Sequence, residues 1–83
     1  MDKKEIEQKV KEILADRLDI NLKNISLDSH LVDDLGMDSF CALELQFELK
    51  EQLGTEIPQN KFSRINTVKE IINCIYNIKK RGA

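Results

Sequence analysis

The chain has 83 residues, a length that holds one hydrophobic core at most and therefore excludes a two-domain enzyme. Hydrophobic residues make up 41% and charged residues 34% of it, so it can bury a modest core but is too polar to cross a membrane. The net charge of -2, the low aromatic content of 5% and the absence of tryptophan exclude typical nucleic-acid binding, which needs clustered positive charge and stacking rings.

Neither a metal site nor export is expected. The two cysteines, Cys41 and Cys74, lack metal-ligand spacing, and the single histidine, His30, cannot complete a site with them. We place His30 on a loop surface and give it no role. No apolar stretch of a signal peptide follows the first charged residues, so a cytoplasmic protein with reduced thiols is expected. We expect one domain over 1–83.

The first helix is predicted from Asp2 to near Leu18. Asp2 and Glu5 have the spacing of a capping box. Apolar residues follow at helical spacing, at Ile6, Val10, Ile13 and Leu14.

A long loop is predicted from Asp19 to Met37, where no hydrophobic period is sustained. Its apolar residues are Ile20, Leu22, Ile25, Leu27, Leu31, Val32 and Leu35. A loop of this length in a small domain packs by its own side chains or serves a function, and we expect both. The leucines are expected to anchor it, and Gly36 to supply the turn that closes it.

The second helix is predicted from Ser39 to about Leu53, and Gly54 ends it. Its apolar face is expected to consist of Leu43, Phe47, Leu49 and Leu53. Three acids at i, i+4 and i+7 are expected to form a row along its exposed side, namely Glu44, Glu48 and Glu51.

Two more helical segments complete the chain. After Pro58, residues 59–64 have room for one or two helical turns with Phe62 pointing inward. The last helix opens with a capping box of Thr67 and Glu70. Isoleucines continue it at Ile71, Ile72, Ile75 and Ile78, and the five C-terminal residues are expected to fray. We therefore predict an all-α four-helix bundle with three long helices, a short third helix and a long first loop.

Charge is distributed unevenly along the sequence. Residues 28–56 contain eight acids and one base, whereas residues 57–83 contain six bases and one acid. An acid-rich middle segment favours a partner with a basic surface, but a solvated helix face explains it equally well.

Ser39 stands where the long loop meets the second helix. A helix cap is the simplest interpretation, because Asp38 and Ser39 both satisfy free backbone amides well. A catalytic serine is not expected, because there is one histidine and no glycine-flanked nucleophile pattern. A phosphate ester at Ser39 would lie at the amino end of the helix, where free amides and the helix dipole favour negative charge. Ser39 is therefore better placed to be modified than to attack.

One run of the sequence, LVDDLGMDSF at 31–40, resembles the signature of acyl carrier proteins. In that family an Asp-Leu-Gly-x-Asp-Ser-Leu segment carries the serine that receives phosphopantetheine. The likeness extends to 43–45, to the segment 51–58 with its closing Thr-Glu-Ile-Pro, and to 65–68. The resemblance implies the same four-helix fold and a carrier instead of an enzyme.

The resemblance also implies a cofactor and partners. A holo-synthase would transfer 4'-phosphopantetheine from coenzyme A to Ser39, with Asp38 helping its magnesium, and the thiol of the arm would hold acyl groups as thioesters. The other partners would be acyl-loading, elongating and acyl-transfer enzymes with basic surfaces. The residues that these partners read are expected to be Glu44, Glu48, Glu51, Phe40 and Met37. The acyl chain is expected to lie among Phe47, Leu49, Ile57, Phe62, Ile65 and Ile72. A monomer without nucleic-acid or membrane contact is expected.

Departures from the family pattern are compatible with a specialised lipid or polyketide pathway as well as with fatty acid biosynthesis. Phe40 and Cys41 replace the leucine and the polar residue that usually follow the serine, and Gln46 stands at a usually apolar place. The short helix loses acidity through Gln59, Asn60, Lys61 and Ser63. The competing hypothesis is a small helical interaction module that binds a basic protein through its acidic second helix and is never modified.

Overall fold

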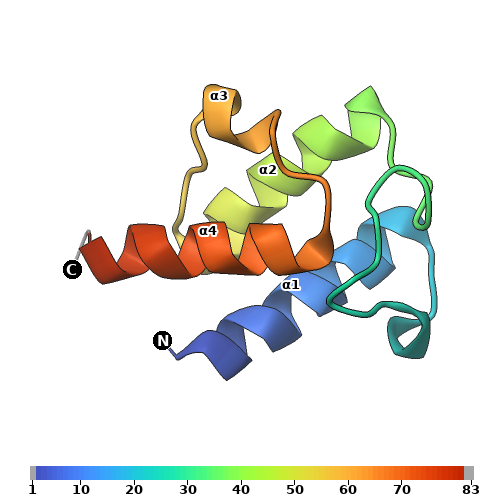
Figure 1. The fold of residues 1–83 in the computed structure, drawn as a ribbon, viewed down its shortest axis with the longest axis horizontal. Helices are drawn as coiled ribbons and strands as arrows, with labels where there is room; N and C mark the ends of the chain where they lie inside the picture. Colours follow the sequence, from blue (N-terminus) through green and yellow to red (C-terminus); the bar gives the residue numbers. More distant parts are fainter. Residues whose placement is uncertain (1, 82–83) are drawn as a thin grey trace.

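The computed structural model describes residues 2–81 (Figure 1). Its elements in chain order are α1 (Lys3–Leu18), the 3₁₀ helix η1 (Leu22–Asn24), α2 (Ser39–Leu53), α3 (Gln59–Phe62) and α4 (Val68–Arg81). α1 packs against both α2 and α4, and α3 is a single turn drawn at the top of Figure 1. The predicted all-α bundle with a short third helix and a long first loop is confirmed. None of the helices within 2–81 is long and apolar enough to reach across a membrane.

Capping boxes begin two of the long helices, as the sequence predicts. The Asp2 carboxylate accepts the backbone N–H of Glu5 at 2.9 Å. At α4 the box is reciprocal, because Thr67 N donates to Glu70 Oε1 at 2.9 Å while Glu70 N donates to Thr67 Oγ1 at 3.3 Å. These bonds satisfy amides that the first turn of a helix leaves free.

A single apolar core lies between the three long helices. α1 and α4 contribute the stripes that their spacing predicts, namely Ile6, Val10, Ile13, Leu14, Val68, Ile71, Ile72 and Ile75. The long loop adds Ile25, Leu31 and Leu35, so part of it does anchor on the bundle. Leu22 and Leu27 are exposed instead, which corrects the expectation that the leucines of the loop are its anchors, and Val32 is exposed too. Gly36 adopts a φ of 73° and supplies the closing turn.

The apolar face of α2 differs from the predicted one. Leu43 and Phe47 are 63% and 61% exposed, whereas Leu45, Leu49 and Leu53 are buried. The prediction is confirmed for Leu49 and Leu53 and wrong for Leu43 and Phe47. Residues two positions apart on a helix point about 200° away from each other, so Leu45 and Leu43 cannot both face the core. Packing against α1 selects the face that contains Leu45.

The end of α4 also differs from the prediction. The helix continues through residues 79–81, so the expected fraying is wrong there, while residues 82–83 lie outside the described part of the chain. Lys79 Nζ donates to the carbonyl oxygen of Leu53 at the end of α2. Three basic residues in the last turn also interact favourably with the negative end of the helix dipole.

Candidate functional site

Ser39 is the first residue of α2, and Asp38 is its N-cap. The Asp38 carboxylate accepts the backbone N–H of Cys41 at 2.8 Å. This hydrogen bond from Cys41 is the main reason why the pKa of Asp38 is lowered. The interpretation of Ser39 as the helix cap is therefore wrong, because the side chain of Asp38 caps α2. The Ser39 side chain is exposed, and its hydroxyl makes no hydrogen bond within residues 2–81.

Cys41 lies one turn into α2 beside the same carboxylate. The adjacent Asp38 carboxylate, followed by partial burial, raises the pKa of the Cys41 thiol. A raised pKa keeps the thiol protonated, and a protonated thiol is a poor nucleophile.

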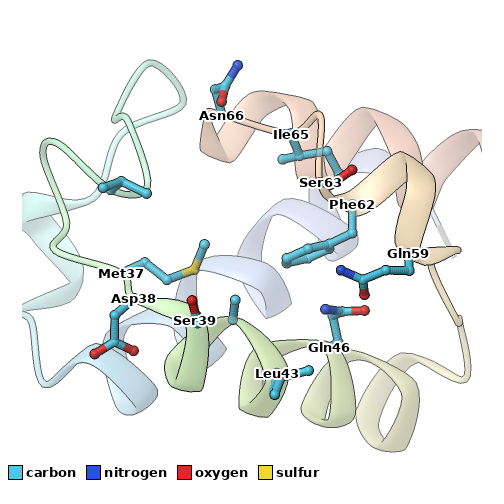
Figure 2. Close-up of a pocket in the computed structure, with 12 residues that line it drawn as sticks. Met37, Asp38, Ser39, Leu43, Gln46, Gln59, Phe62, Ser63, Ile65 and Asn66 are labelled. Atoms are coloured by element: carbon cyan, nitrogen blue, oxygen red, sulfur yellow. The ribbon is translucent and has the colours of Figure 1, made fainter.

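A cavity of about 730 Å³ opens beside Ser39, between α2 and the α3 region (Figure 2). Its apolar lining comes from Val32, Met37, Ala42, Leu43, Phe62 and Ile65. Its polar lining comes from Asp38, Ser39, Gln46, Gln59, Ser63 and Asn66. Figure 2 shows Ser39 and Met37 at one end of the cavity and Gln46 and Gln59 at the other, near the ring of Phe62. The cavity thus combines an apolar wall with hydrogen-bonding groups.

Residues predicted to contact an acyl chain fall into three places. Phe62 and Ile65 line the cavity beside Ser39. Three others are buried in the core and do not line it, namely Leu49, Ile57 and Ile72. Phe47 points outward with 61% of its surface exposed, so its assignment to an interior pocket is corrected. The polar lining at Gln46, Gln59 and Asn66 was missed as a feature of one cavity, because these residues are distant in sequence.

His30 organises the loop that leads to Ser39, so the assignment of no role to it is also corrected. The imidazole Nδ1 of His30 accepts the backbone N–H of Asp33 at 3.1 Å, and the backbone N–H of His30 donates to Asp34 Oδ2 at 2.7 Å. His30 and Thr67 form an isolated antiparallel bridge, which joins the loop to the start of α4. The neighbouring Leu31 N–H donates to the Asn66 carbonyl at 2.8 Å.

The residues predicted to be read by partners have different surroundings. Phe40 is 69% exposed, and Glu51 is exposed too, whereas Met37 is buried and therefore faces the cavity instead of a partner. Arg17 of α1 binds both Glu48, at 2.5 Å, and Glu44, at 3.5 Å. The predicted row of acids along the exposed side is corrected in part, because Glu44 and Glu48 are half-buried and paired with Arg17, whereas Glu51 is exposed.

Comparison with known proteins agrees with this geometry. The family model described as "Phosphopantetheine attachment site" matches residues 8–75, which include the long loop, Ser39 and most of α4. A solved structure described as an acyl carrier protein from Mycobacterium tuberculosis is similar to this chain, with a TM-score of 0.79 and 26% identity. That match covers 84% of this chain and 93% of the other.

The chain belongs to the phosphopantetheine attachment family, and its fold is that of an acyl carrier protein. Its cofactor is covalently attached 4'-phosphopantetheine, and its role is that of a carrier without catalytic activity of its own. The surroundings of Ser39 fit such a group, because its exposed hydroxyl makes no hydrogen bond within the described residues 2–81 and adjoins an open cavity at the amino end of a 15-residue helix.

Proposed function

We propose that Ser39 is the residue that receives 4'-phosphopantetheine and that the chain carries acyl groups in a specialised lipid or polyketide pathway or in fatty acid biosynthesis. The observation that carries this proposal is the Ser39 hydroxyl, which is exposed and unpaired within residues 2–81 at the mouth of the cavity. The group supplies a terminal thiol that holds acyl chains as thioesters. The partners are a phosphopantetheinyl transferase and enzymes that load, elongate and transfer acyl chains.

The amino end of α2 favours a phosphate ester at Ser39. Backbone amides of the first helical turn and the helix dipole both stabilise a negative charge there. Asp38 acts on the incoming transferase instead, because a carboxylate beside the product phosphate would repel it. Its Oδ1 already accepts from Cys41, which leaves Oδ2 available for the magnesium ion of the transferase. The lowered pKa keeps this carboxylate ionised.

Within this proposal, the mixed polar and apolar lining of the cavity favours a specialised pathway. An acyl chain tethered at Ser39 meets the apolar side chains of Phe62 and Ile65. It also meets the carboxamides of Gln46 and Gln59. These groups suit a cargo with hydrogen-bonding groups better than they suit a saturated chain. Gln46 is half-buried and Gln59 is exposed, so water can reach both carboxamides. An apolar cargo that covers them removes this water without replacing its hydrogen bonds, which is unfavourable.

Intact mass measurement after coexpression with a broad-specificity phosphopantetheinyl transferase tests the proposal. We expect the mass of one phosphopantetheine to be added to the wild-type chain and to be absent from Ser39→Ala. Ser63→Ala is the matched control, because Ser63 is an exposed serine that lines the same cavity, and it is expected to be modified normally. An unmodified wild-type chain with several transferases would instead support the hypothesis of an unmodified interaction module.

A further inference from the structure

Arg17 of α1 reaches across the helix interface to two acids of α2. Its Nη2 donates to Glu48 Oε1 at 2.5 Å, and its Nη1 lies 3.5 Å from Glu44 Oε2. The Nε atom of the same guanidinium is buried and has no hydrogen-bond partner within residues 2–81. Burying an unsatisfied nitrogen is unfavourable, so the two carboxylates must supply the attraction that keeps the side chain in place.

Glu48 has both carboxylate oxygens occupied within the protein. Oε1 accepts from Arg17, and Oε2 accepts from Gln52 Nε2 at 2.7 Å. The bond from Gln52 and then that from Arg17 lower the pKa of Glu48. Only 18% of its side chain is exposed. A basic partner would have to displace Arg17 to reach Glu48, whereas Glu51 forms no ion pair within residues 2–81.

Three apolar side chains project outward beside this ion-pair cluster of Arg17, Glu44 and Glu48. They form an apolar stripe at helical spacing i, i+3 and i+7, which consists of Phe40, Leu43 and Phe47, and each of them is more than 60% exposed. Leu43 and Phe47 line a second cavity of about 370 Å³ together with residues of the cluster. Leu43 also lines the cavity beside Ser39, so the two cavities adjoin.

We propose that Arg17 withholds Glu44 and Glu48 from partner enzymes, so that an enzyme acting at Ser39 docks on α2 through an apolar surface that covers Phe40, Leu43 and Phe47. This inference depends on the proposed carrier function. The occupant is the enzyme itself, because any enzyme that reaches the Ser39 hydroxyl must cover the adjacent Phe40.

The pairing of charges within the protein explains why the docking surface of this enzyme is apolar. A lysine or arginine of the partner competes with the Arg17 guanidinium for the two carboxylates. The free energy that it loses on leaving water is then offset only in part by new ion pairs. Exposed aromatic side chains lose no ion pair when they are covered, and aromatic residues commonly dominate the binding energy of interfaces. Arg17 is therefore a specificity-determining residue that acts through the two glutamates.

Kinetics of phosphopantetheine loading test the inference, with coenzyme A and a transferase whose carrier-binding surface combines an apolar patch with basic residues. The rate of mass gain at increasing carrier concentration, in low and high salt, yields KM and kcat for each variant. Arg17→Gln is compared with Lys11→Gln, which removes the same charge from α1 and breaks only the pair with Glu7. Phe47→Ala is compared with Leu22→Ala, because Leu22 is an exposed leucine of η1 outside the stripe.

We expect KM for the wild type to change little with salt, and Phe47→Ala to raise it about threefold or more at unchanged kcat. Arg17→Gln is expected to lower KM in low salt by about threefold relative to Lys11→Gln, and its KM to rise with salt, because the freed acids attract the basic transferase. Equal kinetics for Arg17→Gln and Lys11→Gln, or for Phe47→Ala and Leu22→Ala, would overturn the inference alone. An absence of loading in every variant would overturn the proposed function with it.

Discussion

The carboxylate of Asp38 accepts the backbone N–H of Cys41 at 2.8 Å, and this contact begins α2 so that Ser39 lies in the first helical turn. The same side chain thus caps the helix and places a negative charge one residue before Ser39. These two functions can be separated, because asparagine caps a helix about as well as aspartate but has no charge.

Asp38→Asn is predicted to keep the thermal stability of the wild type and to slow modification of Ser39. Asp38→Ala is predicted to slow modification as well and also to lower the melting temperature, because the Cys41 amide loses its acceptor. Thermal melts and loading kinetics on both variants check this. A loading rate for Asp38→Asn equal to that of the wild type would show that the charge does not serve the transferase.

Leu45→Ala is predicted to lower the free energy of unfolding by about 2–5 kcal/mol, because Leu45 is 1% exposed in the core. Leu43→Ala is the matched variant on the same helix, and it is predicted to change stability by less than about 0.5 kcal/mol, because Leu43 is 63% exposed. Chemical denaturation of both variants measures the difference. Equal losses would mean that the buried face of α2 is assigned incorrectly.

The stability of the folded protein is predicted to fall at low pH, because Glu70 in the capping box of α4 becomes protonated. Hydrogen bonds from the amides of Asn66 and Thr67 lower the pKa of Glu70 from its ordinary value of 4.5. A lowered pKa in the folded state means that the stabilisation is present above pH 4.5 and is lost as the pH falls through the folded value. Melting temperatures between neutral pH and pH 2 are expected to decline less steeply below about pH 4.5 for Glu70→Gln than for the wild type. Parallel curves would contradict the role given to Glu70.

His30→Ala is predicted to loosen the loop before Ser39 while the helices remain folded. The substitution removes the Nδ1 acceptor of the Asp33 amide. Hydrogen exchange is therefore expected to accelerate at Asp33, whereas amides in the middle of α1 keep the protection of the wild type. Unchanged exchange at Asp33 would show that the imidazole does not hold the loop.

The sequence predicts the helices better than their packing. The apolar residues of α1 lie on one face of that helix, and the isoleucines at 71, 72 and 75 lie on one face of α4. Both faces are buried as predicted. In α2 apolar residues occupy most positions, so periodicity is compatible with two faces, and only contact with α1 selects Leu45 over Leu43.

Side-chain partners from distant segments cannot be read from local spacing. Arg17 and Glu48 are separated by 31 positions, and their ion pair exists only because α1 and α2 pack together. The cavity lining is a similar case, because Gln46 and Gln59 come from different helices. Ser39 could be singled out because its signature is contiguous in sequence, whereas the role of His30 depends on how the loop folds back.

Peptide mapping of the modified protein is the most direct test of the central claim. After loading with coenzyme A and a broad-specificity transferase, fragmentation of the peptide that contains residues 38–40 locates the added group. We predict one phosphopantetheine, attached to the hydroxyl oxygen of Ser39. Attachment to another residue such as Ser63, or no attachment at all, would contradict it.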